Sequence, residues 1–114
     1  MPSLPLPPVP QRLRDFLKEY PEHIQILQDD LIEVANKKSP TPPFERAVWA
    51  LEDALSAFIS EARNELKAAQ AMGDAEAIER AEAKERLMSK ARSANGGMSN
   101  FSDLLAYFEQ TWGR

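Results

Sequence analysis

The chain has 114 residues, 14 lysines and arginines against 18 aspartates and glutamates, a net charge of −4 and no cysteine. The missing cysteine excludes disulfides, thiolate nucleophiles and sulfur-ligated metals within this sequence. An acidic chain is poorly suited to nucleic-acid binding, because that binding depends on cations that displace counterions from phosphates. The fully apolar stretches are only a few residues long, so we expect no membrane-spanning helix and a cytoplasmic location.

The first ten residues, MPSLPLPPVP, are rich in proline and are expected to be extended. Proline fixes φ and lacks an N–H donor, which favours polyproline II over helix. Residues 1–10 are therefore expected to precede a single all-helical domain at residues 11–114. Pro7, Pro10 and Arg12 match the pattern of a ligand for domains that bind proline-rich peptides. The alternatives are an extended strap over the helices or a loose tail.

Two helices are expected at residues 11–20 and 21–38. A residue that precedes proline avoids the α region, so the first helix should end or kink at Tyr20. Pro21 suits the first turn of the second helix, because its missing N–H is not needed there. Apolar side chains repeat at helical steps in both segments: Leu13, Phe16, Leu17 and Tyr20, then Ile24, Leu27, Leu31 and Val34.

The longest periodic stretch predicts a helix at residues 42–72, with Thr41 as its N-terminal cap. Its apolar residues follow steps of three and four: Phe44, Val48, Leu51, Leu55, Phe58, Ala62, Leu66 and Ala69. Gly73 suits a left-handed position that ends this helix, and Asp74 suits the cap of the next, expected at residues 74–94. The two helices are predicted to form an antiparallel hairpin with coiled-coil packing.

The apolar stripe of the hairpin narrows beyond residue 60, where only Ala62, Leu66 and Ala69 remain among charged residues. A narrow stripe can contact only one partner helix. We therefore expect a base made of the first two helices and of residues 44–59, 87–94 and 99–112. Residues from about 60 to 86 should project from it as a two-helix arm. The predicted fold class is an all-α helical bundle with a long antiparallel helical hairpin.

The last expected helix, residues 99–112, carries the most aromatic stripe of the chain. Aromatic anchors concentrate binding energy at protein interfaces. The candidate partner-binding residues are therefore Phe101, Leu104, Leu105, Tyr107, Phe108 and Trp112, together with Trp49. The alternative is that this stripe closes the core of the same chain.

Helix 74–94 carries a candidate basic patch at Arg86, Lys90 and Arg92. Such a patch could contact an acidic partner or nucleic acid. Glutamates are interleaved with basic residues along the helix, and this pattern favours a salt-bridged face exposed to solvent.

His23 is the only histidine, and we expect it on the surface near Glu19 and Glu22. A zinc site needs three or four ligands, and no such set is visible, so we expect neither a metal nor a cofactor. Asp29, Asp30 and Glu33 lie beside the apolar face of helix 21–38 and are interpreted as a solvated acidic face. No arrangement of catalytic residues is recognisable, and no small-molecule substrate is evident.

The segment from Ala68 to Ile78, AAQAMGDAEAI, resembles the helix–turn–helix corner of tetratricopeptide repeats. It covers about a tenth of the chain. No period of about 34 residues is visible, and the first helix is about twice as long as those repeats use. The resemblance implies shared turn chemistry between two antiparallel helices.

These patterns predict a small non-enzymatic protein–protein interaction module that self-associates, with a homodimer as the expected form. An adaptor, a secretion chaperone, an antitoxin or immunity protein and a structural subunit all remain open. The alternative is a nucleic-acid-associated helical protein that uses the basic side of helix 74–94.

Overall fold

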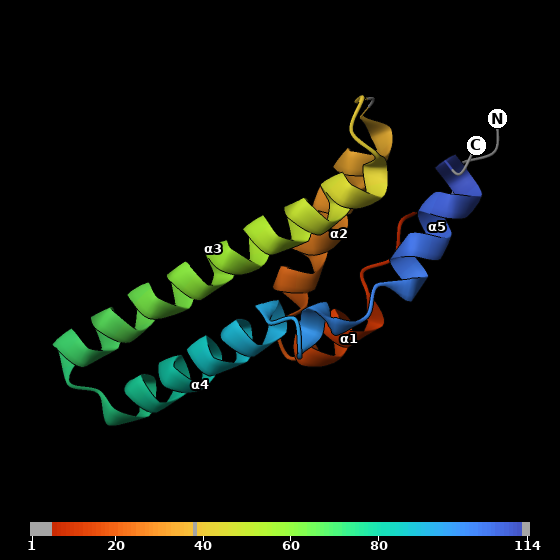
Figure 1. Ribbon diagram of the computed structural model, residues 1–114. Coiled ribbons are helices and arrows are strands. Elements are labelled where there is room, and N and C mark those ends of the chain that lie inside the picture. Colours follow the sequence, from red (N-terminus) through yellow and green to blue (C-terminus); the bar gives the residue numbers. More distant parts are fainter. Residues whose placement is uncertain (1–5, 38, 113–114) are drawn as a thin grey trace.

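The computed structural model describes residues 6–37 and 39–112, with side chains as far as residue 109. Within these residues the chain forms five α-helices, one short 3₁₀ helix and no strand, which confirms the all-α fold (Figure 1). The elements are α1 (Gln11–Phe16), α2 (Pro21–Asn36), α3 (Pro43–Met72), α4 (Ala75–Arg92), η1 (Gly97–Ser99) and α5 (Ser102–Trp112). In this part of the chain no helix is both long and apolar enough to cross a membrane.

The hairpin between α3 and α4 forms where the sequence predicts it. Gly73 adopts the left-handed conformation with φ of 70°, and its N–H donates to the carbonyl oxygens of Ala69 and Gln70. The Asp74 carboxylate then accepts from the N–H groups of Glu76 and Ala77, which caps α4. Glycine adopts this conformation without a Cβ clash, and aspartate satisfies two of the free donors at a helix start.

The first helix is shorter than predicted, because α1 ends at Phe16 and not at Tyr20. Residues 17–19 form a turn, in which the Tyr20 N–H donates to the Leu17 carbonyl oxygen at 2.8 Å. Tyr20 has φ of −128° and ψ of 67°, outside the helical region. Pro21 causes this, since its ring disfavours helical geometry in the residue before it.

Thr41 does not cap α3, so that prediction is wrong. The helix begins at Pro43, Pro42 occupies the capping position with ψ of 137°, and no side chain caps it. Proline at position 43 keeps Pro42 extended in the same way that Pro21 acts on Tyr20. The start of α3 therefore moves one residue beyond the predicted boundary.

The last helix begins at Ser102 and not at residue 99, because η1 precedes it. The Asn100 side-chain oxygen accepts from both the N–H and the hydroxyl of Ser102, which closes a turn before the helix. The Gln11 N–H, at the first residue of α1, donates to Asp103 Oδ2 at 3.1 Å. This bond ties the start of α1 to the start of α5.

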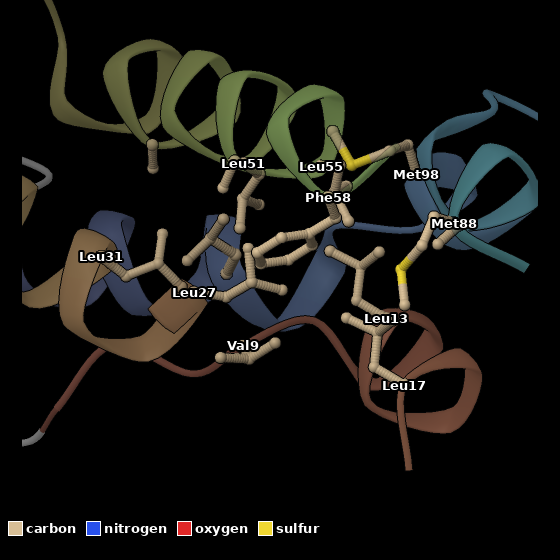
Figure 2. Close-up of a cluster of buried hydrophobic side chains, with 14 of the residues drawn as sticks. Val9, Leu13, Leu17, Leu27, Leu31, Leu51, Leu55, Phe58, Met88 and Met98 are labelled. Carbon is tan, nitrogen blue, oxygen red and sulfur yellow. The ribbon is translucent and has the colours of Figure 1, made fainter. Parts of the chain in front are cut away.

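One cluster of buried side chains joins the elements of the base (Figure 2). It draws on every helix and on the segment before α1. Its members are Val9, Leu13, Leu17, Leu27, Leu31, Ala35, Ala47, Leu51, Ala54, Leu55, Phe58, Met88, Ala91, Met98, Leu104 and Phe108. Burial of each leucine stabilises the fold by roughly 2 kcal/mol before entropy costs are subtracted.

Beyond this base the α3–α4 hairpin continues as an arm (Figure 1), and the molecule measures 56 × 25 × 25 Å. The buried residues of the arm are alanines, Ala62, Ala69 and Ala81, and they lie outside the main cluster. Leu66 and Ile78 are half-buried. Where the apolar stripe narrows, the buried side chains of the hairpin change, because they include large ones in the base but are alanines in the arm.

Candidate functional site

His23 is buried, with 8% of its surface exposed, so the expectation of a surface histidine is wrong. On α2 it precedes Leu27, Leu31 and Ala35 at steps of four, and all three are buried. Residues four apart share one face of a helix. The same spacing can be read from the sequence, where it places His23 on the apolar face of the helix.

The His23 ring lies between two aromatic rings. Its centroid is 4.2 Å from that of Phe58 on α3 and 5.5 Å from that of Tyr20. Among the residues that the structure describes, neither ring nitrogen has a hydrogen-bond partner, and Nε2 is 3.9 Å from Glu61 Oε1. A buried polar group without a partner carries a desolvation cost.

Burial lowers the pKa of His23, and the positive charge of Lys84 lowers it further. The carboxylates of Glu61, Glu22 and Glu65 act in the opposite direction without reversing the shift. The usual histidine pKa is about 6.5, so the folded protein holds this ring neutral at pH 7.

Lys84 on α4 contacts two glutamates of α3 and the Tyr20 ring beside His23. Its Nζ lies 2.9 Å from Glu65 Oε2, 3.6 Å from Glu61 Oε1 and 5.3 Å from the centre of the Tyr20 ring. Burial opposes the charged form, but the hydrogen bond and charge of Glu65 outweigh it and raise the pKa of Lys84. The lysine follows Ala81 by three residues and precedes Met88 by four, so it occupies the α4 face that packs on α3.

This charged junction forms the inner end of a groove that runs along the arm. The groove has a volume of about 310 Å³ and is lined by Tyr20, Glu65, Ala69, Ala77, Arg80, Ala81 and Lys84. Alanines from both helices form its floor, and charged side chains form its walls. Within residues 6–37 and 39–112, no group of three or more histidine, aspartate or glutamate side chains is placed to hold a metal ion.

The candidate partner-binding residues on α5 are divided between the core and the surface. Leu104 and Phe108 are buried in the main cluster, and Phe101 and Tyr107 are half-buried against it. Phe101 makes an edge contact with Phe44, with ring centroids 6.3 Å apart. Leu105 is exposed, and the Trp112 side chain lies outside the described residues.

Trp49 has no part in that stripe. It lies on α3 on the side away from the core, with 54% of its surface exposed. An exposed tryptophan is a strong candidate anchor for a protein partner.

The described part of the proline-rich segment packs against the bundle. Pro7, Val9 and Pro10 are buried, while Arg12 is exposed. The Pro7 carbonyl oxygen accepts from Gln28 Nε2 at 2.6 Å, which fastens the segment to α2. A domain that binds proline-rich peptides would first have to displace this strap; residues 1–5 lie outside the described residues.

The basic patch residues Arg86 and Lys90 are exposed, and Arg92 donates to the Ser56 hydroxyl at 2.8 Å. Nearby, Arg63 on α3 pairs with Glu85 at 2.7 Å. Glu85 therefore neutralises Arg63 beside the patch, while among the described residues neither Arg86 nor Lys90 forms an ion pair.

Comparison of the chain with models of protein families, with curated proteins and with solved structures identifies no match. The function must therefore be argued from the surfaces of the molecule itself.

Proposed function

We propose that this chain is a small non-enzymatic protein–protein interaction module that self-associates through its arm. The observation that carries the proposal is the arm groove, the concave surface lined by Tyr20, Glu65, Ala69, Ala77, Arg80, Ala81 and Lys84. Its alanine floor allows another helix to approach closely. The base has α1, α2 and α5 packed on the hairpin, whereas the arm consists of two helices with an alanine seam.

A second copy of the chain suits this groove because the groove presents both signs of charge. Glu65 on its α3 wall pairs with Lys84, whereas Arg80 on its α4 wall makes no ion pair with any residue the structure describes. A two-fold interface brings each surface patch against the same patch of the partner, so both signs can be matched. Met72, the last residue of α3, is a further exposed apolar side chain on the arm. Coiled-coil packing of the arm remains a prediction within this proposal.

The aromatic stripe of α5 supports self-association less well than the arm does. Leu104 and Phe108 already serve the core of the same chain. Their use in a dimer would require α5 to leave the bundle.

The alternative function is nucleic-acid association through Arg86, Lys90 and Arg92. The exposure of Arg86 and Lys90 favours it, and the pairing of Arg63 with Glu85 weakens it. Retention on a polyanion column at low salt, lost as salt is raised, would favour this alternative.

Light scattering on a sizing column at several concentrations tests self-association. We expect a dimer for the native chain and a monomer for Ala77→Arg, which places a charged side chain in the groove. Ala83→Arg is the matched control, because Ala83 is exposed on α4 and does not line the groove. A monomeric native chain at every concentration would overturn the proposal, as would equal dimerisation of both variants.

A further inference from the structure

A second concave surface lies between α2 and α3, on the base. Its volume is about 370 Å³, and it is lined by Asp30, Glu33, Val34, Ala50, Asp53 and Ala54. We call it the acidic groove. Its floor is apolar, and three of its six lining residues carry a carboxylate.

The carboxylates of the acidic groove are not neutralised. Within the described residues, no lysine, arginine or histidine forms an ion pair with Asp30, Glu33 or Asp53. Arg46, also on α3, donates through Nη2 to the carbonyl oxygens of Val34 and Lys37, at 3.1 and 2.7 Å. Its guanidinium therefore caps the end of α2 and makes no salt bridge with the groove.

Asp30 is the carboxylate of the groove that is most affected by burial and by its negatively charged neighbours. The sequence interpretation placed it on a solvated face, but the structure half-buries it. Burial raises the pKa of Asp30, and the negative charges of Glu33 and Asp29 raise it further. A cation placed in the groove would relieve this repulsion.

Two exposed apolar side chains each precede a carboxylate of the acidic groove by one helical turn. Ile26 is one helical turn before Asp30 on α2 and is 44% exposed, and Trp49 is one turn before Asp53 on α3 and is 54% exposed. Residues four apart lie on the same side of a helix. Because α2 and α3 run in roughly opposite directions (Figure 1), these two positions lie toward opposite ends of the helix pair. The groove therefore has negative charge in its lining, and each of its two helices carries an exposed apolar side chain one turn away.

We propose that the acidic groove binds an amphipathic helical segment of a partner protein that carries lysine or arginine residues. Its apolar face would contact Trp49, Ile26 and the alanine floor, and its cations would pair with Asp30, Glu33 and Asp53. Helical segments commonly bind in grooves between two helices. The groove itself follows α2 from Asp30 to Val34, and the contact surface from Ile26 to Val34 spans roughly 12 Å of the helix, which is about two turns. The inference rests on the proposed role in protein contacts but uses a different surface from the arm.

The test uses a synthetic 14-residue amphipathic peptide of leucine and lysine as the probe. The full chain carries Trp112→Phe, so that Trp49 is its only tryptophan. Peptide binding should shift Trp49 emission to the blue as the indole is covered. The double variant Asp30→Asn with Asp53→Asn should weaken binding about tenfold at low salt. A peptide with glutamate in place of lysine should not bind.

The matched control is Glu79→Gln with Glu82→Gln, which removes the same charge from exposed positions on α4. It should change the affinity less than twofold. Equal losses in both double variants would overturn the inference, because they would indicate attraction by net charge alone. Absence of binding, or binding without a change in Trp49 emission, would overturn it as well. Because dimerisation is measured separately with Ala77→Arg, failure of this test is distinguishable from failure of self-association.

Discussion

His23 Nε2 lies 3.9 Å from Glu61 Oε1, yet in the described part of the chain neither nitrogen of this buried ring has a hydrogen-bond partner. The pair joins α2 to α3 at the point where the base meets the arm. Lys84 on α4 also reaches Glu61, so three helices meet around one carboxylate. We therefore expect stability to depend on the protonation state of His23.

We expect acid to destabilise the protein through His23. The pKa of His23 is lowered in the folded state, chiefly by burial. Below about pH 6.5 the unfolded chain therefore binds a proton that the folded chain does not. Stability contributed by the neutral ring is present above that pH and is lost as pH falls towards the folded pKa, by no more than about 1.4 kcal/mol per pH unit.

Urea denaturation at pH 7.5 and pH 5.5 checks this prediction. His23→Phe keeps an aromatic ring against Phe58 and removes the titrating group, so it should lose less stability between the two pH values than the native chain does. If His23→Phe loses as much stability between pH 7.5 and pH 5.5 as the native chain does, His23 is not the group that causes the loss.

Replacing Lys84 should cost more than replacing Arg63, although each forms a salt bridge across the hairpin. The Lys84 side chain is 13% exposed and contacts Glu65, Glu61 and the Tyr20 ring, whereas the Arg63 side chain is 62% exposed and pairs with Glu85. We expect Lys84→Met to lose about 1–2 kcal/mol and Arg63→Met less than about 0.5 kcal/mol. Thermal unfolding of the two variants at equal salt measures the difference, and equal losses would mean that Lys84 is as solvated as Arg63.

The base should tolerate cavities less well than the arm. Leu55 is fully buried in the main cluster, and Leu66 on the arm is half-buried. Leu55→Ala should cost about 3 kcal/mol, and Leu66→Ala about 1 kcal/mol. Chemical denaturation gives both values. Leu66 does not line the arm groove, so similar losses would contradict the prediction and would mean that Leu66 is covered as fully as Leu55.

Two glycines should respond differently to alanine. A Cβ at Gly97 would collide with the Ala91 carbonyl oxygen and with the Leu13 side chain. At Gly73 the space is open, and the cost comes only from φ of 70°. We expect Gly97→Ala to lose about 2–3 kcal/mol and Gly73→Ala about 1 kcal/mol, measured by thermal unfolding. A mild effect at Gly97 would show that η1 can move away from α1 and α4.

The sequence by itself determined the order of the long helices, the hairpin turn and the narrowing of the apolar stripe along the arm, but not every helix end. These features depend on neighbours in the chain: Gly73 permits the left-handed turn, Asp74 caps α4, and proline acts on the residue before it. Where two prolines adjoin, at Pro42 and Pro43, the same local rule also explains why the predicted start of α3 was one residue early.

Only the tertiary structure decided which polar side chains are buried and which surfaces remain open. The spacing of His23, Leu27 and Leu31 shows that they share a face, but not that Phe58 and Lys84 cover it. The acidic groove likewise needs α2 and α3 to bring Asp30 and Asp53 together. A helical repeat specifies the direction in which a side chain points, whereas its solvation and pKa depend on residues far away in the sequence.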